Sequence, residues 1–173
     1  VARTQPVKLA AMEAHFETAR GVPIVVGGLV DHDASTVRGA LHIPNGLSLL
    51  VDHRTDSVVQ RLNDFPRALH PNVMLVHTAF DVMVGAGALL IALAVTWAAV
   101  RWRRREEAEL PRWLLRALVL ASPLGFIALQ AGWIVTEAGR QPWTIQGVMF
   151  TRDAVTPVQG VQTTLALFTL LYL

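Results

Sequence analysis

Residues 132–143 read GWIVTEAGRQPW, and they join the end of a long apolar segment to a charged turn. The apolar segment covers residues 113–136, which is more than the ~20 residues that an α-helix needs to cross a bilayer. Glu137 stands at its end, and Arg140 follows three positions later. An ionisable group at membrane depth is a candidate functional residue, because it is costly to keep there. The stretch therefore predicts a membrane-spanning helix that ends in a functional carboxylate.

The composition is that of a membrane protein. The chain is 53% hydrophobic and 16% charged, with a mean hydropathy of +0.42, which is too apolar for an ordinary soluble domain. It contains no cysteine, which excludes disulfides, zinc–thiolate sites and cysteine-ligated iron–sulfur clusters. Arginine supplies 14 of the 15 basic residues, and these cluster beside apolar segments. We interpret them as topology signals and expect a lipid bilayer, not a nucleic acid, as the partner.

Two further apolar segments accompany the one that ends at Glu137. Residues 73–100 are long enough to span a bilayer, whereas residues 158–173 are too short and are expected to be a truncated third helix. Pro123 and Gly125 lie in the middle of the 113–136 segment, where a kink is tolerable if neighbouring groups satisfy the freed backbone groups. The predicted fold class is an all-α integral membrane protein with two full transmembrane helices plus a truncated third, preceded by an extracytoplasmic loop region. Because the chain begins without methionine and ends inside an apolar run, we expect a piece of a longer protein.

The charges predict an orientation. Residues 101–112 hold five arginines, so by the positive-inside rule this connection is cytoplasmic. Residues 1–72 and the connection after Glu137 are then both extracytoplasmic. Within residues 1–72 the pattern predicts four local features: a helix over 7–18 ended by Gly21 and Pro23, a β-like run over 24–30, a turn at 44–46, and a short amphipathic helix over 57–65.

The residues around Glu137 are consistent with a ligand site. Glu137 and Arg140 can pair on one helical face, and Trp133 lies one turn earlier on that face. A carboxylate, a guanidinium and an indole together suit an iron ligand, a propionate partner and a ring wall. A solvated acid at a helix end explains the same spacing, and the two readings stay open at this level.

Met83 is a second candidate. Ala79, Ala86 and Gly87 surround it at helical spacing, so a flat macrocycle could approach its sulfur. A face of small residues also suits helix–helix packing, which the residues alone favour. His77 and Asp81 are four residues apart, and mutual pairing is favoured over a proton-transfer or propionate role.

A third candidate is the segment Gln5–Pro6–Val7–Lys8–Leu9–Ala10–Ala11–Met12–Glu13. Taken alone, Lys8 and Glu13 are surface charges on a helix.

These three segments, in this order, resemble the C-terminal portion of the large subunit (subunit I) of cytochrome bd-type quinol oxidases. GRQPW after a glutamate, residues 80–85 (FDVMVG) and QPxKLAAxE each match a landmark of that family. The resemblance implies that Met83 is an axial ligand of a low-spin b haem. It implies that Glu137 ligates a high-spin b haem, with Arg140 in the same site and Trp133 nearby. It assigns quinol oxidation to Lys8 and Glu13.

The same resemblance implies a quinol:oxygen oxidoreductase that reduces oxygen to water, with electrons passing from quinol through the b haems. It also implies a second membrane subunit, a haem d whose ligands lie outside this stretch, and a multi-pass place in a bacterial or archaeal cell membrane. The fragment is not expected to be active alone. Asp81 stands where many members carry arginine, and an acid beside a haem would favour the oxidised iron.

Two alternatives remain at this level. A homologue with altered chemistry could lack the d haem or use another acceptor, and the histidines of the earlier helices would decide this. A haem-free membrane scaffold or transporter subunit would use Met83 for packing and Glu137 in an ion pathway, and it would show no haem absorbance.

Overall fold

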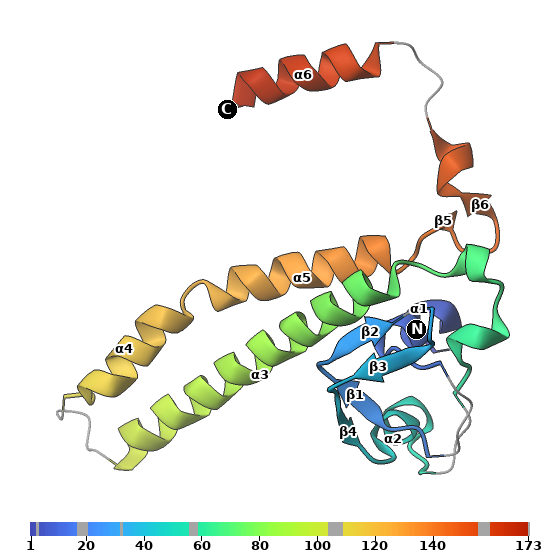
Figure 1. The fold of residues 1–173 in the computed structure, drawn as a ribbon. Helices are drawn as coiled ribbons and strands as arrows, with labels where there is room; N and C mark the ends of the chain where they lie inside the picture. The colour runs from blue at the N-terminus through green and yellow to red at the C-terminus, as the bar shows by residue number, and fades with distance from the viewer. Residues whose placement is uncertain are drawn as a thin grey trace.

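The structure is a computed structural model, and it describes residues 1–2, 4–16, 21–31, 33–55, 59–103, 109–155 and 160–172. Its longest elements are helices, of which α3 and α5 run side by side (Figure 1). The elements in chain order are α1 (Pro6–Met12), β1 (Ile24–Val26), β2 (Leu29–Asp31), β3 (Thr36–Arg38), β4 (Leu41–Ile43), α2 (Gly46–Asp52), the 3-10 helices η1 (Leu62–Asp64) and η2 (Arg67–Leu69), α3 (Val73–Arg103), α4 (Arg112–Ala121), α5 (Leu124–Ala138), β5 (Trp143–Ile145), β6 (Met149–Phe150), η3 (Thr151–Ala154) and α6 (Val161–Tyr172).

Helix α3 is long and apolar enough to cross a membrane, judged by length and composition. Arg101 and Arg103 occupy its last turn, where positive charge is favourable beside the carbonyl end of the helix dipole. Large apolar side chains such as Leu89, Ile91 and Val95 are exposed along it. An apolar surface of this length is expected to face lipid or further helices. The predicted span over residues 73–100 is confirmed as a helix, with three more residues at its end.

The second long apolar segment, Arg112–Ala138, meets the same criterion but is interrupted. Helix α4 ends at Ala121 and α5 begins at Leu124, because Pro123 has no N–H to continue the hydrogen-bond ladder. The helix is therefore interrupted at Pro123, where a kink is tolerable on sequence grounds. Helix α5 packs against α3 along its length.

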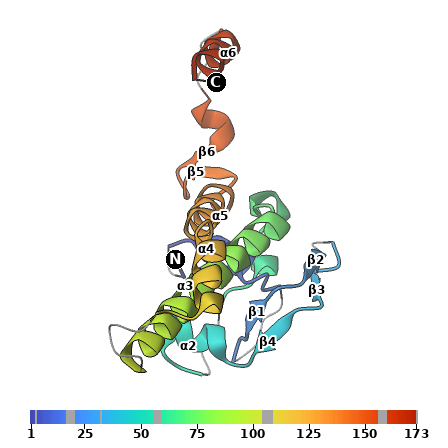
Figure 2. The same ribbon diagram turned by 90° about the vertical axis from the view of Figure 1, so that its left-hand side faces the viewer.

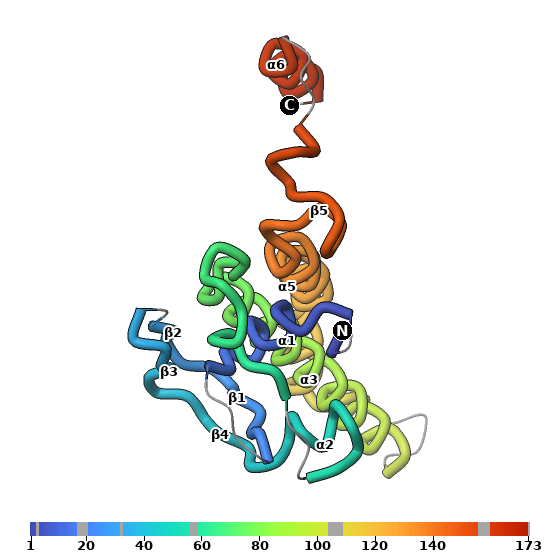
Figure 3. The backbone as a smooth tube through the Cα atoms, turned by 90° about the vertical axis from the view of Figure 1, so that its right-hand side faces the viewer, coloured from blue at the N-terminus to red at the C-terminus, as the bar shows by residue number. Residues whose placement is uncertain are grey.

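The residues before α3 form a small layer packed on the start of that helix. Figures 2 and 3 show β2 and β3 beside α3, on the side away from α5. Helix α1 is held against α3 and η1 by an apolar core. The buried members of this core are Val7, Ala10, Ala11, Ala14, Phe16, Leu62, Val73 and Val76. Burial of these side chains fixes where α1 and the residues after it lie relative to the two long helices.

The all-α prediction was incomplete, because three two-stranded antiparallel sheets are present in the described parts of the chain. β1 pairs with β4, β2 with β3, and β5 with β6. The β-like run over residues 24–30 is split by Gly27 and Gly28, which both adopt positive φ. A side chain on Gly28 would lie 2.7 Å from Val37 and 2.9 Å from the carbonyl oxygen of Arg38, so the turn requires glycine there. The turn at 44–46 is confirmed between β4 and α2.

Two predicted helices were wrong in extent. The helix expected over residues 7–18 ends at Met12, well before Gly21 and Pro23. Ala14 adopts a φ of 45°, which turns the chain and buries both Ala14 and Phe16 in the core. The amphipathic helix expected over 57–65 is reduced to η1, and its residues 57 and 58 lie outside the described residues.

The stretch after α5 folds into a compact hairpin. Gly139 ends the helix with its N–H donating to the carbonyl of Val135. Trp143 in β5 then stacks on Phe150 in β6, with ring centroids 4.1 Å apart. The third apolar helix is α6, whose residues are all exposed and which lies apart from the α3–α5 pair in Figure 1. The predicted start of this segment at residue 158 lies outside the described residues.

Candidate functional site

Glu137 and Arg140 form an ion pair at the end of α5. Arg140 Nη2 donates to Glu137 Oε2, and the two side chains are 41% and 37% exposed. The spacing of three residues over the last helical turn makes this contact possible. The Nε of Arg140 is buried and has no hydrogen-bond partner within the described part of the chain. A buried donor of this kind is costly to leave unsatisfied, so the pair is suited to receive an additional anionic group.

Trp133 lies one turn before Glu137 on α5. Its side chain is 65% exposed, so it extends from the helix surface rather than into a protein core. An exposed indole at this position could cover a flat ligand bound to the outside of α5.

Lys8 brings α1 to the same turn. A Cβ on Gly139 would lie 3.1 Å from Lys8 Cγ and 3.2 Å from Lys8 Cε, so the lysine stem rests on this glycine. Burial lowers the pKa of Lys8, and the nearby charge of Arg140 lowers it further, while Glu137 opposes both effects. The sequence does not predict this contact, because Lys8 and Gly139 are distant along the chain.

Glu13 is buried, with only 3% of its surface exposed. Its Oε2 accepts a hydrogen bond of 3.4 Å from the backbone N–H of Val25. Burial raises the pKa of Glu13 to about 7, and the negative charge of Asp81 adds to this, while the Val25 hydrogen bond and the His77 charge act against it. A carboxyl that titrates near neutral pH is suited to act as a general acid or base.

His77 and Asp81 connect α3 to the segment that holds Glu13. His77 Nδ1 lies 2.8 Å from the carbonyl oxygen of Met12, and Nε2 lies 3.1 Å from that of Gly27. Asp81 Oδ2 lies 3.4 Å from His77 Nε2 and accepts a 2.7 Å hydrogen bond from Gly27 N–H. The favoured pairing of His77 with Asp81 is therefore present. The contacts of both residues with the backbone of other segments could not be predicted from the sequence, because their partners are distant along the chain.

Met83 is half-buried and points toward α5. A Cβ on Gly132 would lie 3.0 Å from Met83 Sδ, so the sulfur is seated where α5 carries no side chain. Ala86, one of the small residues predicted to flank Met83, is buried in the same region of α3. The contact indicates that Gly132 is required for Met83 to keep this orientation.

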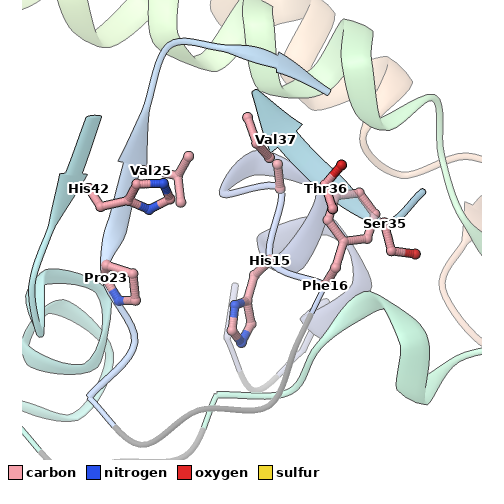
Figure 4. A pocket seen from close by; sticks show the side chains of 9 residues that line it. His15, Phe16, Pro23, Val25, Ser35, Thr36, Val37 and His42 are labelled. Carbon is pink, nitrogen blue, oxygen red and sulfur yellow. The ribbon is translucent and has the colours of Figure 1, made fainter. Parts of the chain in front are cut away.

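Two cavities lie near these residues. One of ≈370 Å³ is lined by His15, Phe16, Val25 and Val37 among others, and Figure 4 shows these side chains around the space between β1 and β3. It adjoins Glu13, because Val25 both lines the cavity and donates to the Glu13 carboxylate. The other cavity, of ≈380 Å³, is apolar and lies between α3 and α5. Met83 is not among the residues that line it.

Four of the six predicted residues fall in two groups joined by the α1 segment. Lys8 lies with Glu137 and Arg140 at the end of α5. The charges of His77 and Asp81, in the first part of α3, act on Glu13. Trp133 and Met83 lie on the long helices themselves. A carboxylate base, two cations and a thioether are then within one end of the helix pair, which suits proton transfer next to a redox cofactor.

Comparison with known proteins identifies relatives of one kind. The chain is 39% identical over 169 residues to the putative cytochrome bd menaquinol oxidase subunit I of Bacillus subtilis (strain 168), covering 97% of this chain and 38% of that protein. It is 31% identical over 167 residues to the cytochrome bd ubiquinol oxidase subunit 1 of the same organism, covering 89% and 35% respectively. The chain thus spans well under half the length of these curated relatives.

A solved structure agrees in fold and sequence. The bd oxidase from Geobacillus thermodenitrificans matches with a TM-score of 0.82 and 41% sequence identity, over 99% of this chain and 39% of that one. The two long apolar helices are consistent with this membrane-embedded neighbour. The family described as cytochrome bd terminal oxidase subunit I matches residues 1–173, and the chain therefore belongs to that family.

Proposed function

We propose that this chain is the C-terminal portion of the large subunit of a terminal oxidase, which oxidises quinol and reduces oxygen to water together with a second membrane subunit. The names of the relatives, a menaquinol oxidase and a ubiquinol oxidase, support quinol as the substrate class. The portion present here contributes the quinol-oxidising segment and ligands of two b haems. Ligands of haem d lie outside it.

One observation carries this proposal. The short α1 segment touches both helices that bear the proposed haem ligands, through Lys8 at the Glu137 turn and through Glu13 beside His77 on α3. Electron transfer requires the bound quinol to lie close to the haem that accepts its electrons. A quinol bound beside the α1 segment would lie close to both helices that carry the proposed haem ligands.

The cavity beside Glu13 offers a place for the quinol ring. Its volume of ≈370 Å³ is within the range of small-molecule sites. Apolar side chains such as Phe16, Val25 and Val37 line it and suit a substituted ring (Figure 4). Glu13 does not line the cavity itself, but its carboxylate accepts from the N–H of Val25, which does, and we place the quinol hydroxyl on that side of the cavity.

Oxidation of one quinol releases two protons and two electrons. The ionised carboxylate of Glu13 accepts the protons one at a time and passes them to the solvent. Its pKa of about 7 lets it both accept and release a proton at neutral pH. Lys8 lies at the Glu137–Arg140 turn and not in the lining of this cavity, so its proposed role is to add positive charge on the side of the α1 segment that faces α5.

The residues fit the two b haems by chemistry. Met83 offers a thioether, whose ligation raises the reduction potential of a low-spin haem. Glu137 offers a carboxylate for the high-spin haem, and the unsatisfied Nε–H of Arg140 suits a propionate. Trp133 contributes an exposed aromatic surface one turn earlier. When bound, the haems supply the one-electron steps between quinol and oxygen.

The chain's place in the membrane follows from its charges. Residues 73–100 and 113–136 cross the cell membrane of a bacterium or archaeon, and the arginine-rich connection 101–112 is cytoplasmic. Residues 1–72 form the extracytoplasmic quinol-binding loop region, while residues 73–173 form the haem-binding helices. Protons from quinol are then released on the outer side.

The test is the reduced-minus-oxidised absorbance spectrum of the complete oxidase, with Met83→Leu and Glu137→Ala variants. We expect Met83→Leu to lose the low-spin b signal and Glu137→Ala to lose the high-spin b signal. Met74→Leu is the matched control, because Met74 is exposed in the first turn of α3. Unchanged signals in both variants would contradict the ligand assignment. No haem signal in the unmutated complex would favour the scaffold or transporter alternative.

A further inference from the structure

His77 is fully buried, with 0% of its surface exposed, yet both of its ring nitrogens face carbonyl oxygens. A neutral imidazole carries one N–H donor and one lone pair. In neutral His77, the ring nitrogen without a proton would have its lone pair against a carbonyl oxygen, that of Met12 or that of Gly27. Both contacts are hydrogen bonds only when both ring nitrogens carry protons.

The surroundings of His77 supply the opposite charge that a buried cation requires. Asp81 lies one turn later on the same helix, with Oδ2 3.4 Å from His77 Nε2. The charges of His77 and Asp81 both act on Glu13, which directly follows the last residue of α1. The β1–β2 turn contributes the backbone of Gly27, which bonds to both His77 and Asp81. The His77 ring thus faces the Asp81 carboxylate and two carbonyl oxygens.

We propose that His77 is a positively charged positioning residue for the quinol-oxidising carboxylate Glu13. It ties the carbonyl of Met12, the residue directly before Glu13, to the haem-bearing helix α3, and its charge stabilises the ionised form of Glu13. This inference rests on the proposed function, in which Glu13 accepts the quinol proton.

A positive charge on His77 shifts the protonation equilibrium of Glu13 in a definite direction. Burial of Glu13 disfavours its carboxylate, whereas the adjacent imidazolium favours it. Replacing His77 by a neutral amide removes the favourable effect, so Glu13 holds its proton to higher pH. Replacing Asp81 by asparagine removes a repulsive negative charge and acts in the opposite direction, while the amide oxygen can still accept from Gly27 N–H.

The experiment measures the pH dependence of quinol oxidation at saturating quinol in the complete oxidase. We expect His77→Gln to move the midpoint of the acidic limb up by about one pH unit, which lowers the rate near pH 7 about fivefold, with recovery toward pH 9. Asp81→Asn should move the midpoint down. His53→Asn is the control, because His53 is exposed and adopts a positive φ that asparagine tolerates.

A purely structural role for His77 would lower the rate at every pH and leave the midpoint in place. That outcome, or a shift of both variants in the same direction, overturns the inference. Glu13→Gln separates it from the proposed function. If Glu13→Gln abolishes quinol oxidation while His77→Gln keeps the wild-type midpoint, only the role of His77 is wrong. If Glu13→Gln keeps full quinol oxidation, the proton acceptor itself is misassigned. Normal low-spin haem absorbance in each variant establishes that it is folded.

Discussion

Gly132→Ala tests whether the sulfur of Met83 is held by an iron. The added Cβ would lie 3.0 Å from Met83 Sδ and 3.8 Å from Cγ, whereas non-bonded heavy atoms prefer about 3.5–4.0 Å. The sulfur must therefore move by several tenths of an ångström, or the helices must separate. A methionine that only fills space can rotate away, because its side chain is flexible. A methionine bound to an iron cannot move without weakening the bond.

The change in stability caused by Gly132→Ala has opposite signs in the two cases. If Met83 is free, alanine in the α5 interior replaces a poor helix former and stabilises by up to about 1 kcal/mol. If Met83 is an iron ligand, the overpacking costs about 1–3 kcal/mol. Thioether ligation favours the reduced iron. Weakening this bond by that amount therefore lowers the reduction potential of the haem by roughly 40–130 mV, because a tenfold change in the equilibrium constant of a one-electron couple corresponds to about 59 mV.

The assay is a redox titration of the low-spin b haem in the complete oxidase, combined with its thermal inactivation midpoint. Gly125→Ala is the matched control, because it lies on the same helix and its added Cβ meets nothing within 4 Å. We expect the control to keep the wild-type potential. An unchanged potential with raised thermal stability in Gly132→Ala would refute the reasoning that iron fixes Met83.

Three further predictions concern the α1 segment and the turn it contacts. Because folding raises the pKa of Glu13 from 4.5 to about 7, the folded state binds a proton more tightly, and stability falls as pH rises from about 4.5 to 7, by about 3 kcal/mol. Glu13→Gln should remove this loss, and thermal inactivation at pH 5 and pH 8 measures it; an equal effect at both pH values contradicts it. Gly139→Ala should displace Lys8 and contact the carbonyl of Val135, which lowers the inactivation midpoint and raises the KM for quinol; an unchanged KM would show that the Lys8 contact is dispensable. Arg140→Gln should alter the high-spin haem spectrum while leaving the low-spin signal intact, as measured by difference absorbance, and a change in the low-spin signal alone would contradict it.

The long helices could be predicted from the sequence because their cause is local. Hydropathy over residues 73–100 fixes α3, and the missing N–H of Pro123 fixes the break between α4 and α5. The end of α5 follows from Gly139, whose position admits no side chain. The pairing of Glu137 with Arg140 needs only helical spacing. Each of these features depends on residues within a few positions of one another.

The arrangement of the α1 segment could not be predicted, because its causes are distant in the chain. Helix α1 stops at Met12 because the following residues bury Ala14 and Phe16 against Leu62 and Val76. The contact of Lys8 with Gly139 depends on how α1 packs against the helix pair. Spacing alone marked Lys8 and Glu13 as surface charges, yet burial at 3% exposure makes Glu13 an internal group.

Asp81 shows how such contacts change the meaning of a single residue. From the sequence, a carboxylate near the low-spin haem predicts a shift toward oxidised iron. In the structure, Asp81 faces His77 and accepts from Gly27 N–H. If His77 is an imidazolium, the pair is close to neutral, and its field at a distance is much weaker than that of an isolated carboxylate. The position that departs from the family pattern would then serve mainly to hold the β1–β2 turn and the proposed quinol-oxidising segment on α3, and we expect a correspondingly small effect on the haem potential.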